Sequence, residues 1–103
     1  AAHRVAPEAV VAGATAPETK AAWGVEDAYR DEKAPRLLVI RVGPRWYARS
    51  AAARREQAAA WWNLWRASVP QGVVSIVDAK RGAPVVQFGR GGEVVGVAPA
   101  PAP

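Results

Sequence analysis

The sequence predicts a small α/β (α+β) domain in which one helix packs on a mixed sheet of three or four strands. Segments 36–43, 73–78 and 85–88 are apolar and of strand length, and segment 51–67, between the first two, has helical periodicity. A short apolar segment at 93–97 completes the order β-α-β-β-β. A right-handed helical crossover makes the first two strands parallel, and the short turns that follow make the later strands antiparallel.

The first strand is expected to be central or well covered, because both of its faces are largely apolar. Gly43 and Pro44 end this strand, and Ser50 then caps the helix. Along the strand, one side carries Leu38, Ile40 and Val42, and the other carries Leu37, Val39 and Arg41.

The second half of the chain carries turn signals between its strands. Asp78 ends the second strand, where an aspartate commonly caps its own backbone, and Gly82 supplies a positive φ to the hairpin loop that follows. Pro84 places the start of the third strand at an edge of the sheet. The GRGG at 89–92 is expected to be another hairpin turn, because it lacks the following helix and the Lys-Ser/Thr pair of a phosphate-binding loop.

Three parts are predicted along the chain. Residues 1–34 form an irregular N-terminal arm, residues 35–97 form the small α/β domain, and residues 98–103, APAPAP, form a stiff extended tail. Within the arm, Thr15 and Gly24 bracket a short helix, and residues 25–33 add a further helical turn. Trp23 and Tyr29 are expected to anchor the arm on the domain, and a mostly extended arm with the same anchors is the alternative.

The three tryptophans of the long helix divide into core and border positions. Trp61 and Trp65 are one turn apart on the inner stripe and are expected to cover the sheet. Trp62 falls at the border of that stripe, on the same side as Arg55 and Arg66, where a guanidinium can stack on an indole. Trp62 is therefore a plain border residue, a protein-docking residue or a base-stacking residue.

A second pairing of tryptophan with arginine precedes the helix. Arg45 and Trp46 lie in GPRWYARS, which is interpreted as a loop whose aromatic rings are either covered or exposed for docking. Tryptophan and arginine dominate the binding energy of protein interfaces, and the short connection brings the loop close to the helix border. The sequence thus predicts one protein-binding edge, formed by Arg45, Trp46, Arg55, Trp62 and Arg66.

Composition narrows the classes of partner and of chemistry. The 14 Lys and Arg exceed the 9 Asp and Glu, so the net charge of +5 favours anionic partners, although an Ala- and Arg-rich composition also follows from GC-rich coding. The absence of cysteine excludes disulfides and thiolate metal sites. No apolar run approaches the length of a membrane span. The chain starts at Ala1 without Met, so we expect removal of an initiator or of a longer segment; the latter fits an exported or organellar protein, and the compartment stays open.

The sequence favours a non-catalytic binding or accessory subunit that docks onto a larger protein assembly of the respiratory, photosynthetic, ribosomal or secretion type. His3 is the only histidine and lies in the arm, and no group of residues suggests catalysis, a metal or a cofactor. A small ligand-binding domain or enzyme is one alternative. The other is a basic nucleic-acid-binding module that uses Arg41, Arg45, Arg49, Arg54 and Arg55.

Overall fold

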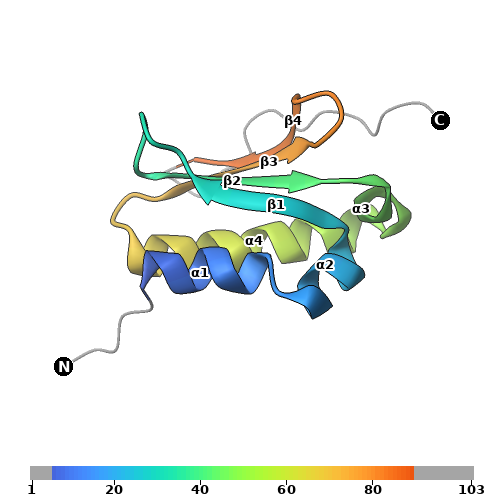
Figure 1. The fold of residues 1–103 in the computed structure, drawn as a ribbon, viewed down its shortest axis with the longest axis horizontal. Helices are drawn as coiled ribbons and strands as arrows, with labels where there is room; N and C mark the ends of the chain where they lie inside the picture. The colour runs from blue at the N-terminus through green and yellow to red at the C-terminus, as the bar shows by residue number, and fades with distance from the viewer. Residues whose placement is uncertain (1–5, 90–103) are drawn as a thin grey trace.

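The computed structural model describes residues 6–89 and shows a two-layer α+β domain, with a mixed sheet packed on a layer of helices (Figure 1). The sheet has four strands in the order β1-β2-β3-β4. The predicted fold class is therefore confirmed. In chain order the elements are α1 Pro7–Ala14, α2 Pro17–Trp23, β1 Val25–Arg30, β2 Leu37–Val42, α3 Pro44–Ala48, α4 Ala51–Ser68, β3 Val73–Asp78 and β4 Pro84–Phe88.

The central part of the fold follows the predicted pattern closely. β2 and β3 pair in parallel, with α4 as the crossover, and β4 returns antiparallel to β3. The Ser50 hydroxyl caps α4 by accepting a hydrogen bond from the Ala53 amide at 3.1 Å. Gly82 has a φ of 70° in the turn before β4, which is the left-handed conformation expected there.

The N-terminal segment differs from the predicted irregular arm. Residues 25–30 form β1, which pairs antiparallel with β2, where a helical turn was expected. A β-bulge between Val25 and Asp27 explains the difference. Because of this bulge, the two buried positions of β1, Val25 and Ala28, are three residues apart, which is a helical spacing. The strand follows Gly24, which ends α2 in the left-handed conformation.

The described sheet reaches four strands through β1, at its N-terminal end, and not through the predicted strand at 93–97. The strand predicted at 93–97, the tail at 98–103 and His3 all lie outside the described residues.

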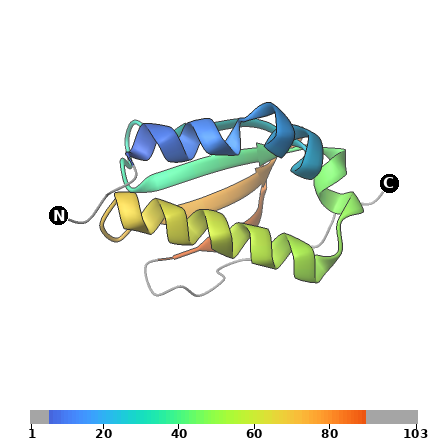
Figure 2. The ribbon, with the colours of Figure 1, turned by 90° about the horizontal axis from the view of Figure 1, so that it is seen from below.

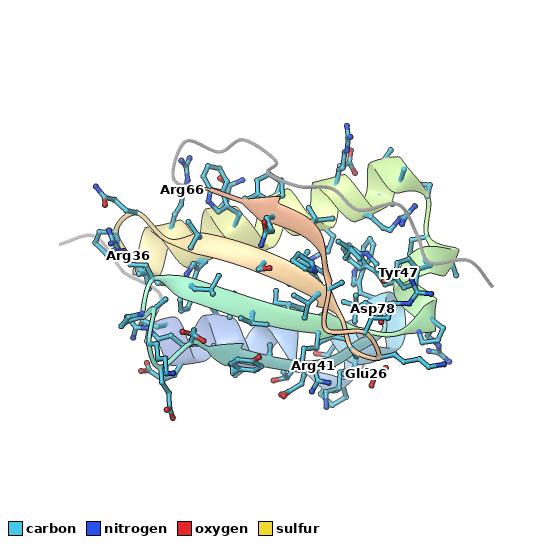
Figure 3. All side chains as sticks on the ribbon, turned by 90° about the horizontal axis from the view of Figure 1, so that it is seen from above. Glu26, Arg36, Arg41, Tyr47, Arg66 and Asp78 are labelled. Carbon is cyan, nitrogen blue, oxygen red and sulfur yellow. The ribbon has the colours of Figure 1, made fainter. Side chains whose placement is uncertain are left out.

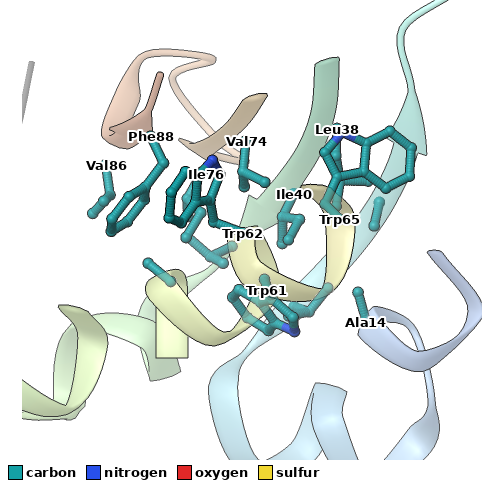
Figure 4. Close-up of a cluster of buried hydrophobic side chains, with 14 of the residues drawn as sticks. Ala14, Leu38, Ile40, Trp61, Trp62, Trp65, Val74, Ile76, Val86 and Phe88 are labelled. Carbon is teal, nitrogen blue, oxygen red and sulfur yellow. The ribbon is translucent and has the colours of Figure 1, made fainter. Parts of the chain in front are cut away.

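The core fills the space between the sheet and the helices (Figure 4). The predicted core residues Trp61 and Trp65 are both buried there, which confirms the helix phasing on that side. Gly72 packs against this core so closely that a Cβ atom at residue 72 would lie 2.6 Å from Cδ1 of Trp65. The sheet contributes side chains that are almost fully buried, namely Leu38, Ile40, Val42, Val74 and Ile76.

The helices cover only one face of the sheet. Seen from below in Figure 2, α1 and α4 run along the sheet, and α2 and α3 lie toward one end of it. In Figure 1 the opposite face of the sheet has no helix on it. The fold thus has a covered face, which holds the tryptophan core, and an open face.

Candidate functional site

Trp62, expected at the border of the helix stripe, is a buried core residue with only 8% of its surface exposed. Its ring stacks on Phe88 of β4 with centroids 5.6 Å apart, and its Nε1 donates to the Gly72 carbonyl at 3.2 Å. The border prediction is wrong because β4 extends the sheet beneath this side of α4. The expected cation–π contact is present, since the Arg66 guanidinium lies 4.1 Å from the Trp62 ring centroid.

Trp46 is fully buried, so it offers no surface to a partner. The expected loop is instead the one-turn helix α3, which places this ring between Trp61, at a centroid distance of 5.9 Å, and Trp23, at 5.8 Å. Trp23 is half-buried and does anchor the N-terminal segment on the core, as predicted. Tyr29 does not, because it points to the open face and is 43% exposed.

The predicted protein-binding edge does not come together as one surface. Arg45 is exposed beside α2, where its guanidinium donates to the Ala21 carbonyl at 2.8 Å. Arg55 is exposed near the start of α4, whereas Arg66 lies in its last turn. At about 1.5 Å per residue, the rise along α4 from Arg55 to Arg66 is about 16 Å. The two halves of the predicted edge therefore lie toward opposite ends of α4, as the positions of Tyr47 and Arg66 in Figure 3 illustrate.

The open face of the sheet was not part of the predicted edge. Tyr29 is exposed there, whereas Val39 and Ser75, in its middle, are only 8% and 5% exposed. The strand registers place Tyr29, Val39 and Ser75 in one row across β1, β2 and β3, with Gln87 beyond them on β4. The Gln87 amide donates to the Ser75 hydroxyl at 3.2 Å and closes this row. We define the open face by its apolar residues Tyr29, Leu37, Val39, Val73 and Val77 and its polar residues Asp27, Arg41, Ser75 and Gln87.

A half-buried tyrosine and a buried aspartate form a polar pair where the parallel strands end. The Tyr47 hydroxyl donates to a carboxylate oxygen of Asp78 at 2.6 Å, and the other oxygen accepts from the amides of Lys80 and Arg81 at 3.0 and 2.8 Å. The hydrogen bond from Tyr47 and those from the turn amides hold the pKa of Asp78 below its ordinary value. Burial, followed by the same hydrogen bond and the charge of Asp78, raises the pKa of the Tyr47 phenol. Asp78 thus caps its own turn, as predicted.

Basic side chains surround this pair at one end of the molecule. Val42 and Asp78 end β2 and β3 side by side, so α3, the start of α4 and the β3–β4 turn all follow at the same edge. Arg41 reaches across to this turn and donates to the Ala79 carbonyl at 2.9 Å. We call this region the basic end; it contains Arg41, Arg45, Arg49, Arg54, Arg55, Lys80 and Arg81.

A shallow apolar groove of about 480 Å³ lies between α1, α2 and α4. Its lining includes Trp23, Trp61 and the exposed Leu64, with Glu18 and Gln57 as polar members. Within residues 6–89, no group of three or more histidine, aspartate or glutamate side chains is arranged to hold a metal ion. None of the helices in the same range combines the length and apolarity needed to cross a membrane.

No protein-family model, curated protein or solved structure gives a significant match to this chain.

Proposed function

We propose that this chain is a non-catalytic protein-binding module, which docks onto a larger protein assembly through the open face of its sheet. The observation that carries the proposal is the one-sided helical layer: the covered face holds the core, and the opposite face carries Tyr29, Leu37, Val39, Val73 and Val77 with no helix of residues 6–89 upon it. Antiparallel and mixed sheets with one uncovered face are generally polar on that face. On this one, the inner strands β2 and β3 carry four aliphatic residues, Leu37, Val39, Val73 and Val77, of which Val39 is only 8% exposed.

The open face has the composition of a protein interface. Its aliphatic residues lie on the two inner strands, β2 and β3, together with Ser75, and Asp27, Arg41 and Gln87 supply polar groups beside them. Protein interfaces likewise combine apolar residues with polar ones at their rim. Tyr29 is the best candidate for an anchor, because 43% of it is exposed and tyrosine is enriched at hot spots. Covering that remaining area contributes about 2 kcal/mol.

The proposal keeps the class of function that the sequence predicts and changes the residues that perform it. The tryptophans expected at the interface stabilise the core, and their arginine neighbours lie far apart. The side chains of the open face are held on strands in a fixed register. They therefore lose little conformational entropy when a partner protein binds them.

The test compares two exposed residues on opposite faces. Tyr29→Asp places a charge in the open face, whereas Leu64→Asp places the same charge in the helical layer, where the native side chain is 47% exposed. We expect both variants to fold, as judged by circular dichroism and thermal melting. Only Tyr29→Asp is expected to lose co-purification with the native assembly.

Site-specific photo-crosslinking locates the contact directly. A benzoylphenylalanine at residue 29 or 77 is expected to form adducts with one and the same partner protein, and at residue 60, which is exposed on α4, with none. Adducts from residue 60 alone, or unchanged assembly of the Tyr29→Asp variant, would overturn the proposal.

A further inference from the structure

We infer that the basic end binds the phosphate backbone of nucleic acid, by charge and without reading bases. This inference does not depend on the open face; the two surfaces share Arg41, near the end of β2, and otherwise consist of different residues. It begins from the distribution of charge. Seven of the twelve lysines and arginines in residues 6–89 belong to the basic end, which is built from four chain segments that meet at one edge of the sheet.

The cations of the basic end are not neutralised by the carboxylates nearby. The guanidinium groups of Arg41, Arg45 and Arg49 each donate to a backbone carbonyl, of Ala79, Ala21 and Ala22 respectively, so they keep their full charge. Asp78 is enclosed by Tyr47 and its own turn and is only 6% exposed.

Three further carboxylates lie at or near this end, and they leave an excess of positive charge in place. Asp27 pairs with Arg41 across β1 and β2, Glu26 lies against Gly43, and Glu56 is in the second turn of α4. Seven cations against four acids leave a net positive potential in this region, and the N–H groups at the start of α4 add partial positive charge to it.

The arrangement of these cations is held by the fold. The Asp78 carboxylate accepts hydrogen bonds from the amides of Lys80 and Arg81, which fixes the turn and leaves both side chains exposed. Arg54, near the start of α4, and Arg81, in the β3–β4 turn, follow strand ends that lie side by side, and the charges of both lower the pKa of the Tyr47 phenol against the effect of burial. Like charges at one end of a domain repel one another, and a bound anion relieves the repulsion.

The chemistry of this surface fits repeated phosphates better than an acidic protein. Six of the seven cations are arginines, whose planar guanidinium matches phosphate oxygens in pairs. A protein interface also needs an accessible apolar centre. The large exposed hydrophobic residues within residues 6–89 are Tyr29 and Leu64, and neither belongs to the basic end. The indole of Trp46, which could stack on a base, is fully buried.

The experiment measures fluorescence anisotropy of a labelled random-sequence 20-base-pair DNA duplex, with the full chain titrated at several salt concentrations. We expect binding that is independent of sequence and a steep fall of log K with log salt, at a slope between about −2 and −6. A labelled poly-glutamate of the same length is the competing probe. Tighter binding of poly-glutamate than of DNA, or a slope near zero, would overturn the inference.

Two double variants with the same net charge distinguish the effect of where the cations lie from the effect of the net charge of the protein. Arg54→Gln with Arg81→Gln removes two cations from the basic end, and we expect the slope to become shallower by about 2. Lys33→Gln with Arg36→Gln removes two exposed cations from the β1–β2 connection at the opposite end of the sheet and is expected to leave the slope unchanged. Equal slopes for the two variants would mean that net charge alone attracts DNA, and the inference would be wrong. Because the open face is untouched in both, assembly with a protein partner reports separately on the proposed function.

Discussion

The indole nitrogens of Trp46 and Trp65 offer a direct test of the hydrogen-bond account of the core. Within residues 6–89, Nε1 of Trp46 is the single buried side-chain polar atom without a hydrogen-bond partner. Nε1 of Trp65 is satisfied, since it donates to the Arg36 carbonyl at 2.8 Å. Replacing one tryptophan at a time with 3-benzothienylalanine exchanges the N–H group for sulfur and keeps nearly the same ring shape, so the change isolates the hydrogen bond.

The two replacements are expected to act in opposite directions. At Trp65 the loss is that of one net hydrogen bond, about 1 kcal/mol, because the Arg36 carbonyl still accepts from the Val73 amide at 2.8 Å and is not left unpaired. At Trp46 the change removes a buried donor that has no acceptor, so the free energy of unfolding is expected to stay the same or to rise by about 1 kcal/mol. The predicted difference in the free energy of unfolding between the two variants is therefore about 1–2 kcal/mol.

Urea denaturation measures this difference in the free energy of unfolding. Circular dichroism is used as the signal, because each replacement also changes the tryptophan fluorescence of the protein. Equal denaturant slopes for the two variants would show that neither changes the surface exposed on unfolding. In thermal melts, 1 kcal/mol corresponds to a shift of about 4–8 °C for a domain of this size. Equal losses at the two positions, or a larger loss at Trp46, would refute the reasoning and mean that the Trp46 nitrogen has an acceptor.

Three further predictions concern packing and titration. Trp62→Ala is expected to cost about 3–5 kcal/mol in urea denaturation, as for a core tryptophan, and a loss below about 1 kcal/mol would mean that the ring is a border residue after all. Tyr47→Phe removes the donor to Asp78 and is expected to cost about 1.5–3 kcal/mol at pH 7, as a hydrogen bond to a charged group. The pKa of Asp78 is lowered in the folded protein, so the stability that its charged form contributes is present above the pKa of Asp78 in the unfolded chain and is lost as the pH falls through its pKa in the folded protein. The difference in free energy of unfolding between wild type and Tyr47→Phe should therefore shrink in acid. A difference that does not change with pH contradicts this. Gly72→Ala is expected to cost about 1–3 kcal/mol, since its Cβ would lie 2.6 Å from an indole carbon of Trp65. Gly13→Ala, in α1 with open space around it, should instead stabilise the protein by up to about 1 kcal/mol. The reverse order of stability in thermal melts would be inconsistent with this packing.

The elements that the sequence predicts correctly, β2, β3 and α4, are those with regular hydrophobic patterns. β2 and β3 are continuous apolar segments, and α4 has a cap at Ser50 and a clear apolar stripe, so their order alone implies a parallel pair with a helical crossover. β1 was missed because its bulge breaks the alternation on which strand prediction depends. Gly24, which ends α2 in the left-handed conformation, was recognised as a helix end; the strand that starts immediately after it was not.

The binding edge could not be predicted because helical phasing gives the direction of a side chain and not the extent of the surface that covers it. Trp62 points toward the border of α4, and Phe88 happens to lie there because β4 adds a strand on that side. The presence of an aromatic residue in the last described strand was the signal that something could cover this border. For Trp46, the proline at the start of α3 indicates a helical turn, which would have rotated the ring inward.

The small size of the other core side chains explains why so many indoles are buried in this chain. α1, α2 and α4 are rich in alanine, which fills little space between the helices and the sheet, and the buried sheet residues are mostly valine, leucine and isoleucine. Trp46, Trp61, Trp62 and Trp65 fill the gap that alanine leaves, and each buries a large apolar area. The two proposals therefore use groups that the core does not: the strand side chains on the open face and the arginines at the basic end. Among residues 6–89, Tyr29 is the large hydrophobic side chain that is exposed on a strand, so it tests the proposed docking surface better than any residue of the tryptophan-rich helix does.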